Sequence, residues 1–151
     1  MTASGGARYN PTANTWKATT TTDAPVLAGH VAVWTGSRMV VWGSLTGTGG
    51  IYDANTDSWT ATDTTCAPTG RLGVSAIWTG ERMIVRGGWA NNYFFGDGYE
   101  FDPVVNSWTK LSNITALSAR FDHTAIWTGT QMIIWAGYDV AYLDTGGILT
   151  P

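Results

Sequence analysis

Apolar positions in this sequence lie in short runs, each bounded by glycine, threonine, asparagine or aspartate. The run at residues 39–42 (MVVW) is nearly continuous and follows a Thr-Gly pair, which predicts a buried strand after a hairpin turn. The preceding run, residues 30–34 (HVAVW), has the length of a second strand of that hairpin. No segment shows the 3.6-residue spacing of an amphipathic helix. The pattern therefore predicts an all-β chain.

Two motifs repeat along the chain at similar intervals. Trp-Thr-Gly, two variable residues, Met and two apolar residues occur three times, at intervals of 44 and 49 residues. An aromatic residue seven positions before a Trp also occurs three times, at intervals of 43 and 49 residues. Two independent motifs with one period indicate a repeated supersecondary unit. The first motif starts at Trp34, Trp78 and Trp127, and the second comprises Tyr9 and Trp16, Tyr52 and Trp59, and Phe101 and Trp108.

Each repeat predicts four short antiparallel strands, which is the composition of a β-propeller blade. The 151 residues form one domain with three blades' worth of strands. One blade is expected to be split between the two ends of the sequence. Residues 1–24 supply third and fourth strands, residues 25–66 and 67–116 supply two whole blades, and residues 117–151 supply first and second strands plus a third-strand stub.

The motifs resemble the kelch repeat, a family of β-propellers. The resemblance rests on Gly87-Gly88, Phe101-Asp102-Pro103, Trp108 and the segment from Arg120 to His123, and it covers nearly the whole chain. The Trp-Thr-Gly version is similar to divergent kelch proteins of bacteria. The sequence departs from the pattern at Gly43-Ser44, at Arg86, at Ala136-Gly137 and at Gly29-His30, which lacks an upstream Arg.

Three blades are few for a closed ring, because propellers have about four to eight. An open arc exposes two unpaired sheet edges and the faces of its end blades. Closed two-fold dimers are the commonest homo-oligomers, so we expect a homodimer whose split blades complete each other to give six blades. The alternatives are a fragment of a six- or seven-bladed single chain, a head-to-tail filament, and a trimer.

Composition excludes several classes of function. The formal net charge is −3 and no Lys/Arg run occurs, which argues against nucleic-acid binding. No apolar run has the length of a membrane span, and the first ten residues are not a signal peptide. By the family resemblance, a longer parent protein would be extracellular or at the cell surface, and the compartment stays open. The single cysteine, Cys66, excludes an internal disulfide and predicts a buried or half-buried thiol.

The sequence offers little for catalysis, metals or cofactors. Its two histidines, His30 and His123, align at the start of first strands, so we interpret them as packing residues and assign no catalytic residue. The turn from Asp53 to Asp57 lacks the Gly and Glu of a calcium loop. We predict neither a metal site nor a cofactor. The repeated Trp-Thr-Gly tryptophans and the methionines that follow them are expected to fill the core between blades.

Two loops between second and third strands, residues 89–100 and 137–147, are rich in aromatic side chains. The resemblance to kelch proteins implies that such loops rim one mouth of the channel, with arginines lining it. An arginine there suits an acidic peptide or a carboxylated ligand, and the aromatic rings suit a peptide or a carbohydrate. The alternative is that the rings pack on their own blades and the arginines bond to carbonyls. The candidate residues are Arg71, Arg120, Trp89, Tyr93, Phe94, Tyr138 and Tyr142.

The sequence thus predicts a non-enzymatic scaffold or binding module that self-assembles through its split blades, without nucleic acid or membrane as partner. A purely structural or engineered propeller fragment without a ligand is the alternative. Kelch-type copper oxidases and sialic-acid mutarotases define a third, enzymatic class. Copper would require Tyr, Cys and His ligands, and a mutarotase site would require converging Arg, Glu and His, yet only Glu81 and Glu100 are available.

Overall fold

The computed structural model describes residues 5–112 and 117–151. This part of the chain contains fifteen β-strands in five antiparallel sheets and no helix. The expectation of an all-β chain is confirmed. Within the same residues, there is accordingly no helix long and apolar enough to cross a bilayer.

Four of the sheets follow one another along the chain, and we number them sheets 1 to 4. Sheets 2 and 3 have four strands each, whereas sheet 1 has two and sheet 4 has three. Sheet 1 comprises β1 (Ala7–Asn10) and β2 (Thr15–Ala18); sheet 2 comprises β3 (His30–Trp34), β4 (Arg38–Gly43), β5 (Thr48–Asp53) and β6 (Ser58–Ala61); sheet 3 comprises β7 (Ser75–Trp78), β8 (Met83–Arg86), β11 (Gly98–Asp102) and β12 (Ser107–Lys110); sheet 4 comprises β13 (Thr124–Trp127), β14 (Met132–Trp135) and β15 (Gly146–Leu149).

The hairpin turns form where the sequence places Thr-Gly and Asp or Asn. In sheet 2, the backbone N–H of Thr35 donates to the carbonyl of Arg38 at 2.9 Å, and Gly36 takes a φ of 98° that favours glycine. The next turn is held by Asp53, whose carboxylate accepts the backbone N–H of Asn55 at 2.9 Å. The other repeats carry the same turn chemistry, which explains why their hairpins have the same register.

That register sets the residues opposite each other in every sheet. In sheets 2 and 3, the Met of the second strand lies opposite the aromatic residue of the third strand. This residue in turn lies opposite the repeat's Trp on the fourth strand. The pairs are Met39 with Tyr52 and Tyr52 with Trp59 in sheet 2, Met83 with Phe101 and Phe101 with Trp108 in sheet 3, Met132 with Leu149 in sheet 4, and Tyr9 with Trp16 in sheet 1.

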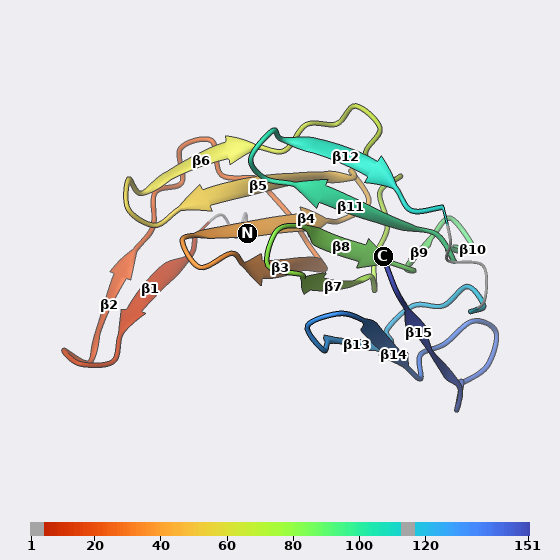
Figure 1. The fold of residues 1–151 in the computed structure, drawn as a ribbon. Coiled ribbons are helices and arrows are strands. Elements are labelled where there is room, and N and C mark those ends of the chain that lie inside the picture. Colours follow the sequence, from red (N-terminus) through yellow and green to blue (C-terminus); the bar gives the residue numbers. More distant parts are fainter. Residues whose placement is uncertain (1–4, 113–116) are drawn as a thin grey trace.

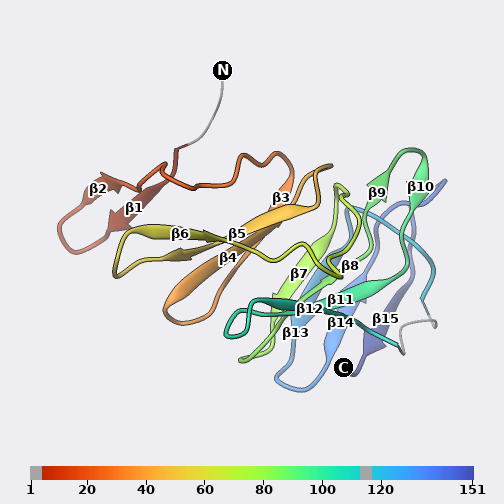
Figure 2. The same cartoon turned by 90° about the horizontal axis from the view of Figure 1, so that it is seen from above.

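The sheets are arranged as successive layers whose first strands are neighbours. Strand β7 contacts β3 on one side and β13 on the other. Figure 1 shows the β1–β2 hairpin at one end of this series and sheet 4 at the other. Figure 2 gives the same order from above. The arrangement leaves one face of sheet 4, and much of one face of sheet 2, without a neighbouring four-stranded sheet.

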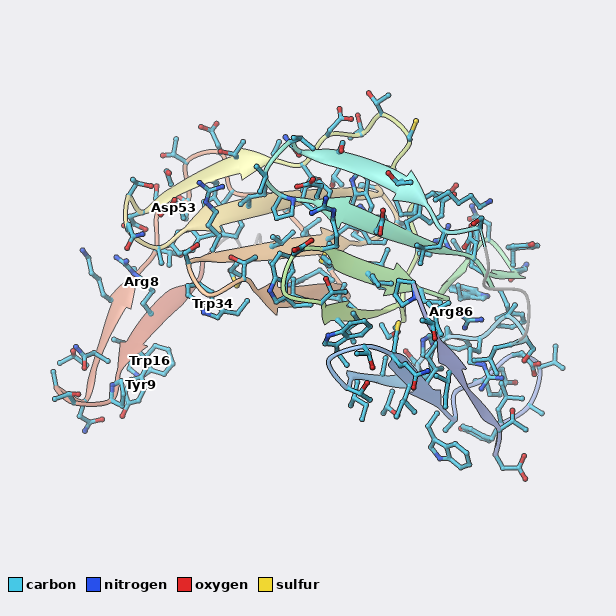
Figure 3. All side chains as sticks on the ribbon, in the orientation of Figure 1. Arg8, Tyr9, Trp16, Trp34, Asp53 and Arg86 are labelled. Carbon is cyan, nitrogen blue, oxygen red and sulfur yellow. The ribbon has the colours of Figure 1, made fainter. Side chains whose placement is uncertain are left out.

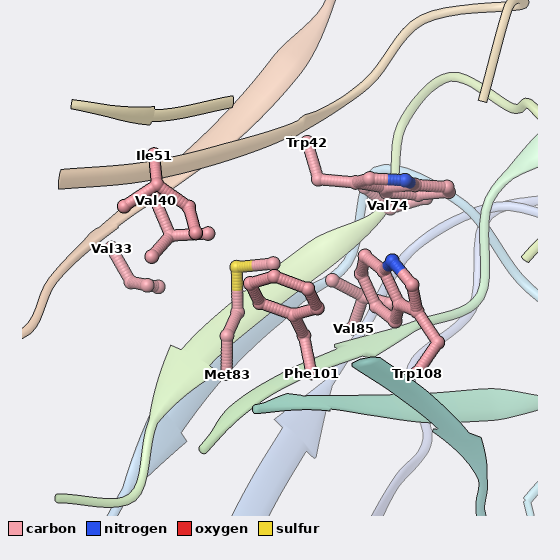
Figure 4. Packing of buried hydrophobic residues seen from close by; sticks show 9 residues of the cluster. All are labelled: Val33, Val40, Trp42, Ile51, Val74, Met83, Val85, Phe101 and Trp108. Atoms are coloured by element: carbon pink, nitrogen blue, oxygen red, sulfur yellow. The ribbon is translucent and has the colours of Figure 1, made fainter. Parts of the chain in front are cut away.

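Two apolar clusters hold the layers together. The larger one lies between sheets 2 and 3, where the indoles of Trp42 and Trp108 meet edge to face with centroids 5.4 Å apart (Figure 4). The smaller one joins Ile77 and Ile84 of sheet 3 to sheet 4. The larger cluster contains Val33, Val40, Trp42, Ile51, Val74, Met83, Val85, Phe101 and Trp108, and the sheet 4 members of the smaller one are Met132, Ile134 and Leu149.

Three local features differ from the sequence expectations. Trp34, expected in the core, is 53% exposed because sheet 1 has no inner strands to cover it. Cys66 is exposed rather than buried, since it lies in a turn with a φ of 59°. The aromatic loop of sheet 3 forms an additional hairpin of β9 (Trp89–Ala90) and β10 (Tyr93–Phe94).

Candidate functional site

Arg71 precedes the first strand of sheet 3 and is 2% exposed. Its guanidinium donates to the carbonyls of Thr69 at 2.9 Å and Gly87 at 3.3 Å, and it forms an ion pair with Asp97. The group also lies over the ring of Phe95, 3.6 Å from the centroid. The structure therefore places Arg71 among acceptors of its own sheet, where it ties the start of the sheet to the aromatic loop.

Arg120 has the matching position before sheet 4 and is 1% exposed. Its Nη1 donates to the carbonyls of Ala136 at 2.9 Å and Thr145 at 2.8 Å, and its Nη2 donates to the hydroxyl of Ser118 at 2.9 Å. Burial lowers the pKa of this guanidinium. Both arginines thus connect the beginning of a first strand to the loop that follows the second strand.

The aromatic residues of the two loops meet across sheets 3 and 4 around Phe121. The ring of Phe94 stacks on Phe121 at 5.8 Å, and Trp89 lies 6.4 Å from the same ring. Tyr138 contacts Phe121 at 5.6 Å and Tyr142 at 5.3 Å, both edge to face. Four of the predicted site residues therefore belong to one continuous row of rings.

The remaining aromatic candidate, Tyr93, belongs to a neighbouring group. Its ring is 4.9 Å from Phe95, the ring over which Arg71 lies. Tyr93 is exposed, and Tyr142 at the far end of the row is 91% exposed. A recess of about 580 Å³ opens beside the row, lined by Phe121, Asp122, Ala136, Gly137, Tyr138, Tyr142 and Leu143.

Phe95 and Phe121 are central to these contacts, yet sequence reasoning did not select either as a site residue. Phe121 lies next to Arg120 and exchanges two backbone hydrogen bonds with Tyr138, at 3.0 and 2.9 Å. Leu72, next to Arg71, exchanges two such bonds with Trp89. The residue after each arginine is thus bonded to the aromatic loop of its own sheet, and the repeated Arg-apolar pair was the signal that could have identified Phe121.

Ser75 and His123 form the one hydroxyl–imidazole pair on these sheets that resembles a nucleophile and its base. The Ser75 hydroxyl lies 2.7 Å from Nε2 of His123, joining sheet 3 to sheet 4. Both residues are buried, and Nδ1 of His123 has no partner among the described residues, so no carboxylate orients the ring. Burial, followed by the charges of Arg86 and Arg120, lowers the pKa of His123 to about 4. We assign this pair to packing, since a nucleophile must reach its substrate.

The carboxylates and histidines of the described residues do not gather into a group of three or more that could hold a metal ion. The turn at Asp53 uses its carboxylate on backbone N–H groups and on Arg38. These hydrogen bonds, with that to Asn55 first, lower the pKa of Asp53. The chemistry of this turn is therefore that of a hairpin.

The outer face of sheet 4 displays side chains that are buried at the matching positions of sheet 2. In sheet 2, Trp42 is fully buried against sheet 3. Its counterpart in sheet 4, Trp135, is 57% exposed, and Ile126 and Ile148 beside it are also exposed. The strand register is the same in the two sheets. The exposed face of sheet 4 therefore corresponds to the face of sheet 2 that packs against sheet 3.

The opposite end presents the other half of the same interface. Trp34 of sheet 2 matches the half-buried Trp78, which packs against the cluster between sheets 2 and 3. The rings of Tyr9 and Trp16 are 4.9 Å apart, and those of Tyr52 and Trp59 are 5.0 Å apart, but Tyr9 and Trp16 are both exposed. Figure 3 shows Tyr9, Trp16 and Trp34 at the end formed by β1, β2 and β3, while Arg86 lies between sheets 3 and 4.

Successive antiparallel sheets with matching register, Gly-rich second-to-third loops and arginines before the first strands define a protein of the propeller-repeat class. Residues 6–146 match the family model described as the KLHDC2/KLHL20/DRC7 Kelch-repeats domain. The chain therefore belongs to the kelch-repeat family, which confirms the resemblance stated from the sequence. A comparison with curated proteins finds no match. Kelch-repeat domains generally act as binding or scaffold modules.

Proposed function

We propose that this chain is a non-enzymatic scaffold that associates with a second copy of itself, so that the two copies complete a ring of six blades. The single observation that supports this is the pair of complementary exposed faces at its two ends. Trp135 and Ile126 on sheet 4 have the positions of Trp42 and Val33, which are buried on sheet 2. Trp34 on sheet 2 has the position that is covered on sheet 3.

The gain from covering these faces is large enough to sustain association. Full burial of a large apolar side chain stabilises by about 1.5–3 kcal/mol. A two-fold ring has two identical junctions, each of which covers both kinds of face. A filament or a trimer would use the same junction, but a dimer closes with the fewest copies.

The hairpin of sheet 1 is attached to the outer strands of sheet 2. A recess of about 170 Å³ lies between the hairpin and sheet 2, lined by Gly5, Gly6, Thr19, Thr20, Ala24, Pro25, Leu27, His30, Met39, Val41 and Trp59. Arg8 holds the hairpin to sheet 2 through the carbonyl of Ala54 and an ion pair with Asp57 at 3.8 Å. These contacts lie at the turn between β5 and β6, the third and fourth strands of sheet 2, and among the described residues β1 has no second strand beside it.

Light scattering on a sizing column tests this proposal with a matched pair of variants. Trp135→Glu places a charge on the outer face of sheet 4 and is expected to give a monomer where the unmodified chain gives a dimer. Val104→Glu is the control, because Val104 is 84% exposed in the turn between β11 and β12 of sheet 3, which has a neighbouring sheet on each side. If the two variants have the same mass distribution, the end faces do not mediate association.

A second candidate function is binding of a peptide or a carbohydrate at the row of rings around Phe121. The observation that favours it is the recess of about 580 Å³ beside Tyr138 and Tyr142. Both arginines already bond within the chain, so stacking on the rings would supply most of the affinity. Arrays of acidic peptides and of oligosaccharides test this idea, with Tyr142→Ala as the binding-deficient variant and Val105→Ala as control. Equal signals from both variants would exclude the recess.

A further inference from the structure

Strands β15 and β1 have the same sequence pattern, but only β15 has a second strand beside it. In sheet 4, β15 pairs with β14 so that Gly146 lies opposite Trp135 and Leu149 lies opposite Met132. At β1, the matching positions are Tyr9, which lies opposite Trp16, and Gly6, which immediately precedes the strand. In the described residues, β1 pairs with β2 alone. Two strands therefore match the edge of β14: β15 of the same chain and β1 of another copy.

Gly6 supports this match, because the known contacts of its own chain do not require a glycine. At Gly49 of sheet 2, an added Cβ would lie 2.3 Å from the carbonyl oxygen of the second strand, and the same distance applies at Gly146 of sheet 4. These glycines are needed because the second strand lies so close. At Gly6, the nearest described atom is the hydroxyl of Thr19 at 3.1 Å. A second strand beside β1 would require a glycine at this position, and the described residues of its own chain do not supply such a strand.

The aromatic pair on sheet 1 gives the same indication. Tyr52 and Phe101, at the position of Tyr9 in the other sheets, are buried, whereas Tyr9 is 46% exposed. The residue at this position in sheet 4 is Leu149, which packs with Ile77 and Ile84 of sheet 3. Replacing Leu149 by Tyr9 of another copy would cover the Tyr9 ring on this apolar surface. It would also add a fourth strand, β2, which β15 lacks among the described residues.

We propose that self-association is a strand exchange: β15 leaves the edge of β14, and β1 of a second copy takes its place. This inference rests on the proposed function, because it specifies how the copies join. The register follows from the other sheets, with Trp135 opposite Gly6, Ile133 opposite Arg8 and Met132 opposite Tyr9 of the second copy. In the unassociated chain, β15 covers a strand edge that would otherwise be open to any β-strand.

A locked chain tests the exchange. In a Cys66→Ser background, Ile133→Cys and Ile148→Cys place two thiols opposite each other on β14 and β15. The disulfide would hold β15 in place, so the oxidised chain is expected to run as a monomer and the reduced chain as a dimer. Dimers that are equally abundant under both conditions would show that β15 does not have to leave, which overturns the exchange. Such dimers would still be consistent with association through the end faces.

Mixing two singly substituted chains tests the register. One chain carries Arg8→Cys and the other Ile133→Cys, both in the Cys66→Ser background, and a disulfide between them is expected after oxidation. Lys17→Cys replaces Arg8→Cys in the control, because Lys17 lies opposite Arg8 on β2, one strand further from β14. A bond with position 17 alone, or a bond between positions 8 and 148 in the corresponding mixture, would mean that the hairpin adds elsewhere and would overturn the proposal.

Deletion of residues 146–151 provides a variant that does not depend on a disulfide. It keeps Thr145, to which Arg120 donates, and it removes the competitor of β1. In this variant, Leu149 no longer has to be displaced before β1 of another copy can bind. The concentration at which half of the chains are dimeric is therefore expected to be at least about tenfold lower than for the complete chain. An unchanged or higher concentration contradicts the exchange. If neither this chain nor the complete one associates at any concentration, both the exchange and the proposed function are wrong.

Discussion

Acidification is expected to destabilise the fold through one residue, His123. The ring accepts or donates a hydrogen bond with Ser75 at 2.7 Å, and it faces the positive charges of Arg86 and Arg120. Burial and these two charges lower its pKa from 6.5 to about 4. The unfolded chain therefore binds the proton more readily than the folded chain, and the folded state loses stability as the pH falls from about 6.5 to about 4.

The magnitude follows from the difference between the two pKa values. With one pKa unit equivalent to about 1.36 kcal/mol, the loss is about 1.4 kcal/mol at pH 5.5 and about 2.5 kcal/mol at pH 4.5, relative to pH 7.5. Asp53, Asp57 and Asp139 have lowered pKa values, mainly because their carboxylates accept hydrogen bonds. Their contribution is lost below a pH of about 3.8, outside this window.

Urea unfolding followed by far-ultraviolet circular dichroism, at pH 7.5, 5.5 and 4.5, measures the loss. His123→Gln removes the titrating ring, so its free energy of unfolding is expected to vary by less than about 0.5 kcal/mol over the same range. His30→Gln is the matched control, since His30 has the equivalent repeat position but is exposed, and it should keep the full loss. Equal losses in His123→Gln and in the unmodified chain, or an NMR titration midpoint of the His123 ring near 6.5, would refute the reasoning.

Three further predictions concern stability, each measured as the free energy of unfolding in urea at low protein concentration. Trp42→Ala should cost about 3–5 kcal/mol because it empties the cluster between sheets 2 and 3, whereas Trp135→Ala, at the exposed matching position, should change stability by less than about 0.5 kcal/mol. Equal costs would mean that sheet 4 is covered in the monomer. Asp97→Asn should cost about 1–3 kcal/mol because it leaves the buried guanidinium of Arg71 without a charged acceptor, and a neutral result would show that the carbonyls suffice. Gly49→Ala should cost about 1–3 kcal/mol because its Cβ would lie 2.3 Å from a backbone oxygen, and full stability would rule out that close approach.

The strands of the repeats could be predicted because local chemistry determines them. Thr35 and Gly36 form the predicted hairpin turn, and Asp53 forms the predicted polar turn. The burial of Trp42 follows from the same periodic pattern. Residues that recur in every repeat are predicted to pack between neighbouring sheets. This prediction holds for each sheet that has a neighbouring sheet against that face.

The remainder depends on which neighbours are present, and the repeat itself does not contain that information. Trp34 and Trp42 both read as core residues, but only Trp42 has a complete sheet against it. The sequence left open whether Arg71 and Arg120 line the channel or bond to carbonyls, because the answer depends on loops that fold over them. The row of rings required Phe121, whose partners lie in two loops that are distant from each other in the sequence.

The most direct test of self-association is the solution mass of the unmodified chain, by light scattering on a sizing column over a wide range of concentrations. The chain has a mass of 16.2 kDa. The account predicts a species of twice that mass that does not grow further as the concentration rises and that gives way only to the folded monomer on dilution, as a closed ring of two copies requires. A folded monomer at every concentration would contradict the account, and so would a mass that keeps rising with concentration, which would indicate an open filament.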